Sequence, residues 1–141
     1  MRIMIMGAGA LGCYIGARLG VAGHAVELIA RGAHLEAMQR VGLRVESPLG
    51  DIAHAPITAC ATPEEAGPAD VIFLMVKNFD LETAAALLLP VLRPSSGVVT
   101  VQNGITAPDR LAALIGPNRV IPGIVFLPAD VKAPGVVRHS A

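Results

Sequence analysis

Three glycines near the N-terminus have the spacing of a loop that could hold phosphate groups. The run Gly7 to Gly12 has the form Gly-x-Gly-x-x-Gly; it follows a short apolar segment, Arg2 to Met6, and opens a stretch with helical periodicity. At a strand-to-helix turn, Gly7 would allow the tight turn, Gly9 would let the backbone approach a pyrophosphate, and Gly12 would let the helix pack closely on the sheet. Free N–H groups at the helix start would add partial positive charge. The spacing therefore predicts a dinucleotide-binding loop at residues 7–12.

A single arginine lies where a site of this kind chooses between NAD and NADP. Residues 25–30 form a second apolar segment, and Arg31 follows it directly. An NAD site would carry Asp or Glu there to accept a hydrogen bond from the ribose 2′-hydroxyl, and Glu27 lies inside the segment, too early for that role. A guanidinium suits a 2′-phosphate, by paired hydrogen bonds or by lying against adenine. The pattern favours NADP(H), with a solvated surface arginine as the alternative.

Two further polar residues follow predicted strands. Lys77 comes directly after the apolar run 71–76, and Asn103 follows residues 97–102. In a doubly wound sheet, ligands bind outside the carboxyl ends of the strands, near the point where strand order reverses. Lys77 could offer a cation to a phosphate, a ribose or an acidic substrate, and Asn103 could pair with a nicotinamide amide or orient a carbonyl. We therefore expect both side chains on the rim that carries the glycine loop and Arg31.

The elements that must position these residues alternate along the chain. Short apolar runs alternate with stretches of helical periodicity, and the runs are apolar throughout, as in parallel strands covered on both faces. We predict an α/β fold of Rossmann type: a doubly wound, mostly parallel sheet with helices on both faces. The predicted strands are residues 2–6, 25–30, 71–76, 97–102 and 119–127, the last broken at Pro122 and Gly123. The first predicted helix has Leu11, Ile15 and Leu19 on one face, with Gly12 and Gly16 beside it so that the backbone can approach a sheet closely. The other predicted helices are residues 32–41, one capped by Asp80 and ended or kinked at Pro90, and one from Thr106 to Gly116.

Other segments are less regular. Residues 43–47 and 51–59 alternate weakly on either side of a Pro-Leu-Gly turn, which indicates a strand pair or an irregular excursion. Residues 62–65 are typical of the start of a short helix, and residues 135–139 of the start of one more strand.

Composition excludes several classes of protein. The chain has 141 residues, 53% of them hydrophobic, and a formal charge of +0, which fits one packed domain and not the basic surface of a nucleic-acid binder. Two cysteines cannot form a disulfide framework, which favours buried thiols in a reducing cytoplasm. Charged residues interrupt the apolar N-terminal third, so no membrane span is expected. The four histidines lack metal-ligand spacing, so no metal site is expected.

Together these motifs resemble the ketopantoate reductase (2-dehydropantoate 2-reductase) family over essentially the whole chain. The matching segments are RIMIMGAGALG (2–12), RGAHLEAMQRVGLRV (31–45), VIFLMVKNFD (71–80), TVQNGI (100–105) and PGVVRHSA (134–141). The glycine loop alone is shared with many dehydrogenases, whereas the loop, Arg31, Lys77 and Asn103 in this order are much more specific.

The resemblance implies NADPH-dependent reduction of a 2-oxo acid, 2-dehydropantoate to (R)-pantoate, on the route to pantothenate. It places Lys77 and Asn103 near the nicotinamide and the substrate, and it suggests a cofactor contact for Ala129. The expected cofactor-binding residues are Gly7, Ala8, Gly9, Ala10, Leu11, Gly12, Arg31, Lys77, Asn103 and Ala129. Residues 1–141 correspond to the NADP(H)-binding domain of the family.

The family's helical C-terminal domain, which supplies the proton-donating lysine and most substrate contacts, has no counterpart in these residues. We therefore expect no catalytic residue within this chain, NADP(H) binding with little or no turnover by the chain alone, and self-association through the apolar surface that the missing domain would cover. Two alternatives remain: a reductase of a different 2-oxo acid, and a nucleotide-sensing regulatory domain of the kind that gates cation transport. Regulatory domains usually carry an acid after the second strand, so Arg31 argues against the latter.

Overall fold

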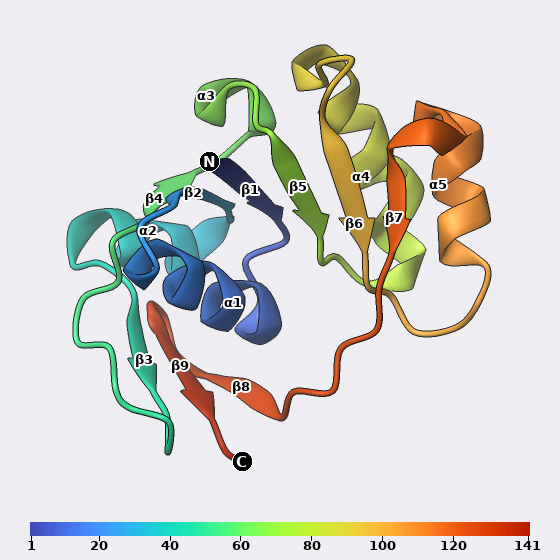
Figure 1. Ribbon diagram of the computed structural model, residues 1–141. Helices are drawn as coiled ribbons and strands as arrows, with labels where there is room; N and C mark the ends of the chain where they lie inside the picture. The colour runs from blue at the N-terminus through green and yellow to red at the C-terminus, as the bar shows by residue number, and fades with distance from the viewer.

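The computed structural model describes residues 1–141 and is built around a six-stranded sheet in which every pairing is parallel (Figure 1). The strand order is β4-β2-β1-β5-β6-β7. The chain runs from β1 outward to β2 and β4, then crosses to β5 and continues to β7, so the order reverses beside β1. The strands are β1 (Arg2–Met6), β2 (Ala25–Ile29), β4 (Thr58–Cys60), β5 (Val71–Leu74), β6 (Gly97–Thr100) and β7 (Val120–Pro122).

Helices cover both faces of this sheet. Alternate residues of β1 point to opposite sides, so Ile3 and Ile5 join one core cluster and Met4 and Met6 join the other. The first cluster includes residues of α1 (Ala10–Val21) and α2 (Gly32–Arg40). The second includes residues of α3 (Pro63–Ala66), α4 (Leu81–Leu88) and α5 (Ala107–Ile115). The predicted doubly wound Rossmann-type fold is confirmed.

A second, three-stranded sheet packs against α1 on the side away from the main sheet (Figure 1). Its order is β3-β9-β8, with β3 (Arg44–Glu46) parallel to β9 (Val136–His139) and β8 (Ala129–Ala133) antiparallel to β9. The sequence indicated β9 but not β8. Residues 43–47 and 51–59 are not a simple strand pair, because β3 joins this small sheet while β4 joins the main one; a single bridge links Val45 and Ile52.

The face of α1 that packs on the sheet is only partly the predicted one. Ile15 and Leu19 are partly buried against the core, Leu11 is not among the residues packed there, and the most buried positions include Gly16, as expected, and Ala17. A Cβ on Gly16 would lie 2.7 Å from the Leu28 side chain, so the helix approaches the sheet more closely than a leucine stripe permits.

Several predicted boundaries also shift. The strand predicted at 119–127 is Val120–Pro122, so it ends at the predicted break, and the residues after the break do not continue it. Asp80 does not cap α4 with its side chain; a 3₁₀ turn, η1 (Asn78–Asp80), leads into the helix instead. Helix α4 ends at Leu88, where Pro90 forces a second 3₁₀ turn, η2 (Leu89–Val91), as expected. None of the helices is both long and apolar enough to cross a bilayer.

Candidate nucleotide-binding site

The glycine loop between β1 and α1 fits the three roles expected of its glycines. Gly7 has a φ of +112°, and a Cβ there would lie 2.8 Å from the backbone carbon of Met75. A Cβ on Gly12 would overlap the Gly7 carbonyl and lie 2.9 Å from the Ile5 side chain. Gly9 differs, because nothing lies within 4 Å of its would-be Cβ. Two glycines therefore permit close packing, and the third borders open space where a ligand can reach the backbone.

The N-terminus of α1 presents this open space with partial positive charge. Gly9 is the N-cap residue, no side chain caps the helix, and the first turn holds no acidic residue. The N–H groups of the first turn have no intrahelical acceptor. Uncapped N–H groups and the helix dipole together favour an anion at this position.

A cavity of about 530 Å³ opens beside the loop and is shared by several strand ends. Its walls come from the glycine loop, the carboxyl ends of β2 and β5, α4, one residue of α2 and one residue of β8. It is lined by Met6, Gly7, Ala8, Gly9, Ile29, Ala30, Arg31, His34, Ala61, Met75, Val76, Lys77, Asp80, Thr83, Ala84, Leu87 and Val131. The lining is mostly apolar with a few converging polar groups, as is typical of cofactor sites.

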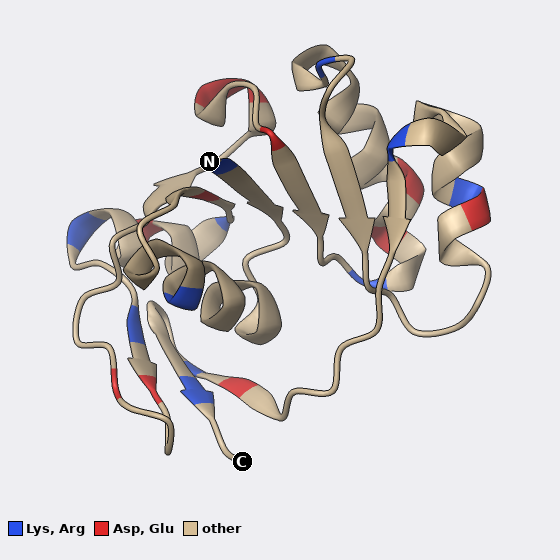
Figure 2. Ribbon diagram, viewed as in Figure 1, with Lys and Arg blue, Asp and Glu red and all other residues tan.

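Two cations reach this cavity from different elements. Arg31 is the N-cap residue of α2, and Lys77 follows β5; both side chains are exposed. Neither is among the five ion pairs of the chain, which involve other side chains. Figure 2 shows Lys and Arg interspersed with Asp and Glu over the elements. The cavity thus combines a helix N-terminus with two cations that are free to pair with an anionic ligand.

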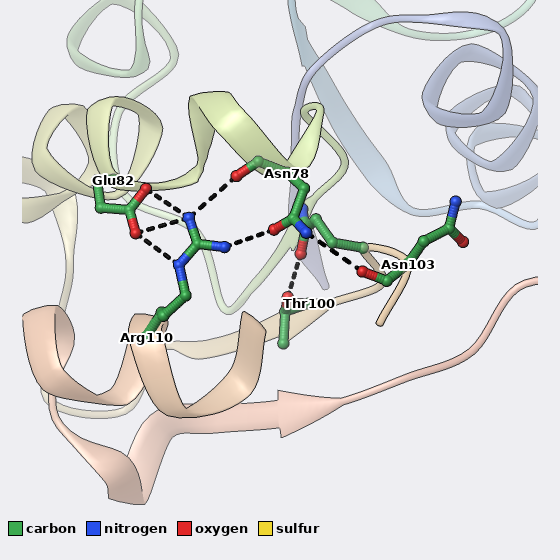
Figure 3. Close-up of polar contacts among 6 residues, drawn as sticks. Asn78, Glu82, Thr100, Asn103 and Arg110 are labelled. Atoms are coloured by element: carbon green, nitrogen blue, oxygen red, sulfur yellow. Dashed lines mark hydrogen bonds and ion pairs between the residues drawn. The ribbon is translucent and has the colours of Figure 1, made fainter. Parts of the chain in front are cut away.

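Asn103 lies on the neighbouring loop and is tied to the segment after Lys77. The Asn78 side chain donates a hydrogen bond of 3.4 Å to the Asn103 carbonyl. Arg110 of α5 donates to the Asn78 side chain at 2.7 Å and to its carbonyl at 3.1 Å, and it pairs with Glu82 of α4 (Figure 3). The Asn103 amide points away from these partners (Figure 3). The loop that carries Asn103 is therefore joined to the loop that carries Lys77, with the amide left free.

Gln102 provides a second link between the strand ends. Its side-chain nitrogen donates to the carbonyls of Leu74 at 2.8 Å and Val76 at 3.2 Å, while its oxygen accepts from the Thr100 hydroxyl. These bonds connect the end of β6 to the end of β5. Sequence reasoning missed Gln102, Asn78 and Arg110, because no local pattern says which polar side chains will cross between loops.

The Arg110–Glu82 pair has the expected electrostatic effect. The hydrogen bond from Arg110 lowers the pKa of the Glu82 carboxyl, and the same bond raises the pKa of Arg110. Both groups are solvent-exposed, so this pair fixes geometry more than it adds stability.

A second cavity, of about 520 Å³, lies at the carboxyl ends of β6 and β7. It is lined by Thr100, Gln102, Gly104, Ile105, Pro108, Pro122, Gly123 and Ile124. Large apolar side chains stand exposed in this part of the chain: Ile105 is 91%, Ile124 84% and Phe126 94% accessible. This apolar rim is unlike the packed glycine-loop region.

The structure brings most of the predicted site together. Ala8 lines the main cavity with Gly7, Gly9, Arg31 and Lys77. The other three loop residues form the first turn of α1, and Asn103 lies on the adjoining loop. Ala129 begins β8 and pairs with His139; it does not line the cavity, although Val131 of the same strand does. His34 also lines the cavity and was not singled out as a site residue. No group of three or more His, Cys, Asp or Glu side chains could hold a metal ion.

Comparison with known proteins assigns the chain to a family. Residues 3–141 match the family model described as ketopantoate reductase PanE/ApbA. The chain belongs to the ketopantoate reductase family. It is 39% identical to a 2-dehydropantoate 2-reductase of Mesorhizobium japonicum, an alignment that covers 99% of this chain and 49% of the relative.

Solved structures agree with this assignment. The crystal structure of a PanE/ApbA family ketopantoate reductase from Ralstonia eutropha superposes with a TM-score of 0.94 at 38% identity, covering 100% of this chain and 47% of that one. A ternary structure of D-mandelate dehydrogenase with NADH and anilino(oxo)acetate gives a TM-score of 0.89 at 25% identity, covering 100% and 46%. The chain thus spans about half the length of these relatives, and it belongs to a family of oxidoreductases.

Proposed function

We propose that residues 1–141 are the NADP(H)-binding half of an oxidoreductase that reduces a 2-oxo acid, with 2-dehydropantoate as the first candidate substrate. The observation that supports this most directly is the cavity in which the backbone at Gly9, the N-terminus of α1 and the Arg31 side chain meet. All three favour phosphate, and they come from the loop, the helix and the strand end that a dinucleotide contacts in this fold.

The residues divide the nucleotide between them. The glycine loop and first turn of α1 would hold the pyrophosphate. Arg31, at the end of the second strand, would pair with the 2′-phosphate. Lys77 and the Asn103 amide would lie toward the nicotinamide and the carboxylate of the acceptor. A bound NADPH would supply the hydride; the residues of this chain bind and orient.

The side chains of Ile105, Ile124 and Phe126, here called the apolar rim, leave apolar surface exposed to solvent. Hydride transfer needs the acceptor carbon held against the nicotinamide with water excluded. We infer that the helical domain expected from the family covers this rim and completes the substrate site. The chain alone should therefore bind nucleotide and show little turnover of 2-dehydropantoate.

Reduction of a different 2-oxo acid is the second candidate. The structural relative named D-mandelate dehydrogenase holds NADH together with anilino(oxo)acetate, a 2-oxo acid derivative. The preference for NADPH or NADH would depend on Arg31, and the choice of 2-oxo acid would depend on groups outside the nucleotide cavity. Cofactor and substrate can therefore be tested separately.

Titration of NADPH and NADH by fluorescence tests the cofactor assignment. Arg31→Ala should weaken NADPH binding by about 1–3 kcal/mol, the range for a lost charged hydrogen bond, and leave NADH binding unchanged. Arg40→Ala is the matched control, because Arg40 is exposed at the far end of α2 and does not line the cavity. An equal loss for both nucleotides in Arg31→Ala would contradict the 2′-phosphate role.

A further inference from the structure

A chain of hydrogen bonds reaches the glycine loop from α1, α2 and the small sheet, and two of its members, Ala8 and His34, also line the cavity. The Cys13 thiol of α1 donates to the Ala8 carbonyl at 3.3 Å. The His34 Nε2 atom of α2 lies 3.3 Å from the Cys13 Sγ atom. The backbone N–H of Gly135, in the turn between β8 and β9, donates to His34 Nδ1 at 2.9 Å. The small sheet is thereby linked through two side chains to the loop.

One arrangement of protons satisfies every group in this chain of bonds. Since Nδ1 accepts from Gly135, a neutral His34 carries its proton on Nε2 and donates to Cys13. Cys13 must then donate its own proton to Ala8. Complete burial raises the pKa of the Cys13 thiol to about 12, which keeps the donor proton in place at neutral pH.

The acceptor at the end of this chain shares a peptide unit with Gly9. In a trans peptide the C=O and the following N–H point in opposite directions, and the chain has no cis peptide bonds. With the Ala8 carbonyl held toward Cys13, the Gly9 N–H points away from α1. That N–H makes no hydrogen bond to any other backbone group, and Gly9 borders both the cavity and open space.

We propose that Cys13 and His34 are positioning residues that lock the Ala8–Gly9 peptide in the orientation that presents the Gly9 N–H to a nucleotide phosphate. This inference rests on the proposed nucleotide function and extends it to two side chains that support the loop. The Ala8 N–H is held separately by the Ile29 carbonyl at 3.0 Å, so the loop remains anchored to the sheet when the thiol is removed and only the next peptide gains freedom to turn.

Three variants of the full chain test the role of the thiol and the imidazole. Cys13→Ala removes the donor, Cys13→Ser keeps a donor in the same place, and His34→Phe keeps an aromatic ring and removes both nitrogen atoms. Binding of NADPH is compared with binding of adenosine 2′-monophosphate, which carries the 2′-phosphate but no pyrophosphate. Chemical denaturation of each variant confirms that the protein is folded.

The expected result is selective. Cys13→Ala and His34→Phe should bind NADPH about three- to tenfold more weakly, the range for one hydrogen bond, and bind adenosine 2′-monophosphate as the unmodified chain does. Cys13→Ser should restore NADPH affinity to within about twofold. The amide NMR signal of Gly9 in the ligand-free protein should shift in Cys13→Ala and stay near its original position in Cys13→Ser.

Contrary results separate the two proposals. Unchanged NADPH affinity in Cys13→Ala, or parallel losses for both ligands, would overturn the positioning role while leaving the nucleotide function intact. Failure of the unmodified chain to bind either ligand would overturn the proposed function and this inference with it.

Discussion

Two regions along the carboxyl-terminal edge of the main sheet are built differently. Around β1 and α1, a tightly packed backbone shapes the site: Gly7 and Gly12 have no room for a side chain, and the helix lies between two sheets. Around β6, β7 and α5, exposed polar contacts hold the loops, and Ile105 and Phe126 face solvent. The first region is closely packed, and the second exposes apolar side chains.

Under the proposed function, the first region would bind the phosphates of the nucleotide, and the second would face the site of hydride transfer. A preformed phosphate site needs fixed N–H groups and close backbone approach, which local packing provides. A hydride-transfer site needs an acceptor held and shielded from water, and the exposed rim provides neither. Substitutions in the two regions should therefore have different effects on stability, nucleotide binding and self-association.

The largest effect is expected in the packed region. Gly7→Ala would place a Cβ 2.8 Å from the Met75 backbone and force a positive φ on a residue with a side chain. We expect a loss of about 2–4 kcal/mol in the free energy of unfolding, from overpacking combined with backbone strain. Urea denaturation followed by circular dichroism measures it.

Gly9→Ala is the control for that variant. Gly9 has a φ of −77°, and nothing lies near its would-be Cβ. Stability should change by no more than about 0.5 kcal/mol, whereas NADPH binding should fall because the new methyl group occupies the phosphate position. Similar destabilisation by both variants would show that the two glycines do not have the separate roles that the packing indicates.

The next largest effect is expected on self-association through the apolar rim. Residues 1–141 on their own should self-associate at high concentration, because Ile105, Ile124 and Phe126 are almost fully exposed and Ile105 and Ile124 line the same cavity. Phe126→Ser should weaken that association measurably in sedimentation velocity without lowering nucleotide affinity. A strictly monomeric chain over the whole accessible concentration range would contradict this expectation.

A smaller effect links pH to the packed region. Burial lowers the pKa of His34 in the folded chain, so below the ordinary histidine pKa of about 6.5 the unfolded chain binds this proton more readily. Neutral His34 should make its full contribution to the free energy of unfolding above a pH of about 6.5. This contribution should be lost as the pH falls below that value and through the lowered pKa of the folded chain.

Comparison with His34→Phe isolates this share of the pH dependence. His24, His54 and His139 remain in both proteins, as do Arg31, Lys77 and Asp80 around the cavity. Cys13 is the titratable side chain in direct contact with His34, and it stays protonated over this range. The unfolding free energy of the variant should depend less steeply on pH below about 6.5 than that of the unmodified chain. Identical slopes would show that the neutral form of the partly buried His34 ring does not contribute to stability.

The packed region was also the more predictable one from sequence. The run from Gly7 to Gly12 and Arg31 have local causes, a turn and a strand end, so their places follow from residue type and spacing. The small sheet does not: Val45 pairs with Val137, and nothing near β3 in the sequence indicates a partner so distant along the chain. The contacts of Arg110 with Asn78 were missed for the same reason, since they depend on how two helices and two loops meet.

The smallest effect is expected at the polar contacts that join the loop of Lys77 to the loop of Asn103. Arg110→Ala removes the donors to Asn78 and Glu82, so the loops that carry Lys77 and Asn103 should lose their shared support. NADPH binding should weaken by about two- to threefold, a fraction of one net hydrogen bond, with binding of adenosine 2′-monophosphate unchanged. The pKa of Glu82, which Arg110 lowers, should rise toward its usual value, and carboxyl NMR titration measures it. Arg40→Ala is again the matched control. If the Glu82 pKa returns to its usual value in Arg110→Ala while NADPH affinity is unchanged, the loops of Lys77 and Asn103 need no support from α5. The contrast between the region around β1 and the region around β6 and β7 would then rest on the exposed apolar side chains alone.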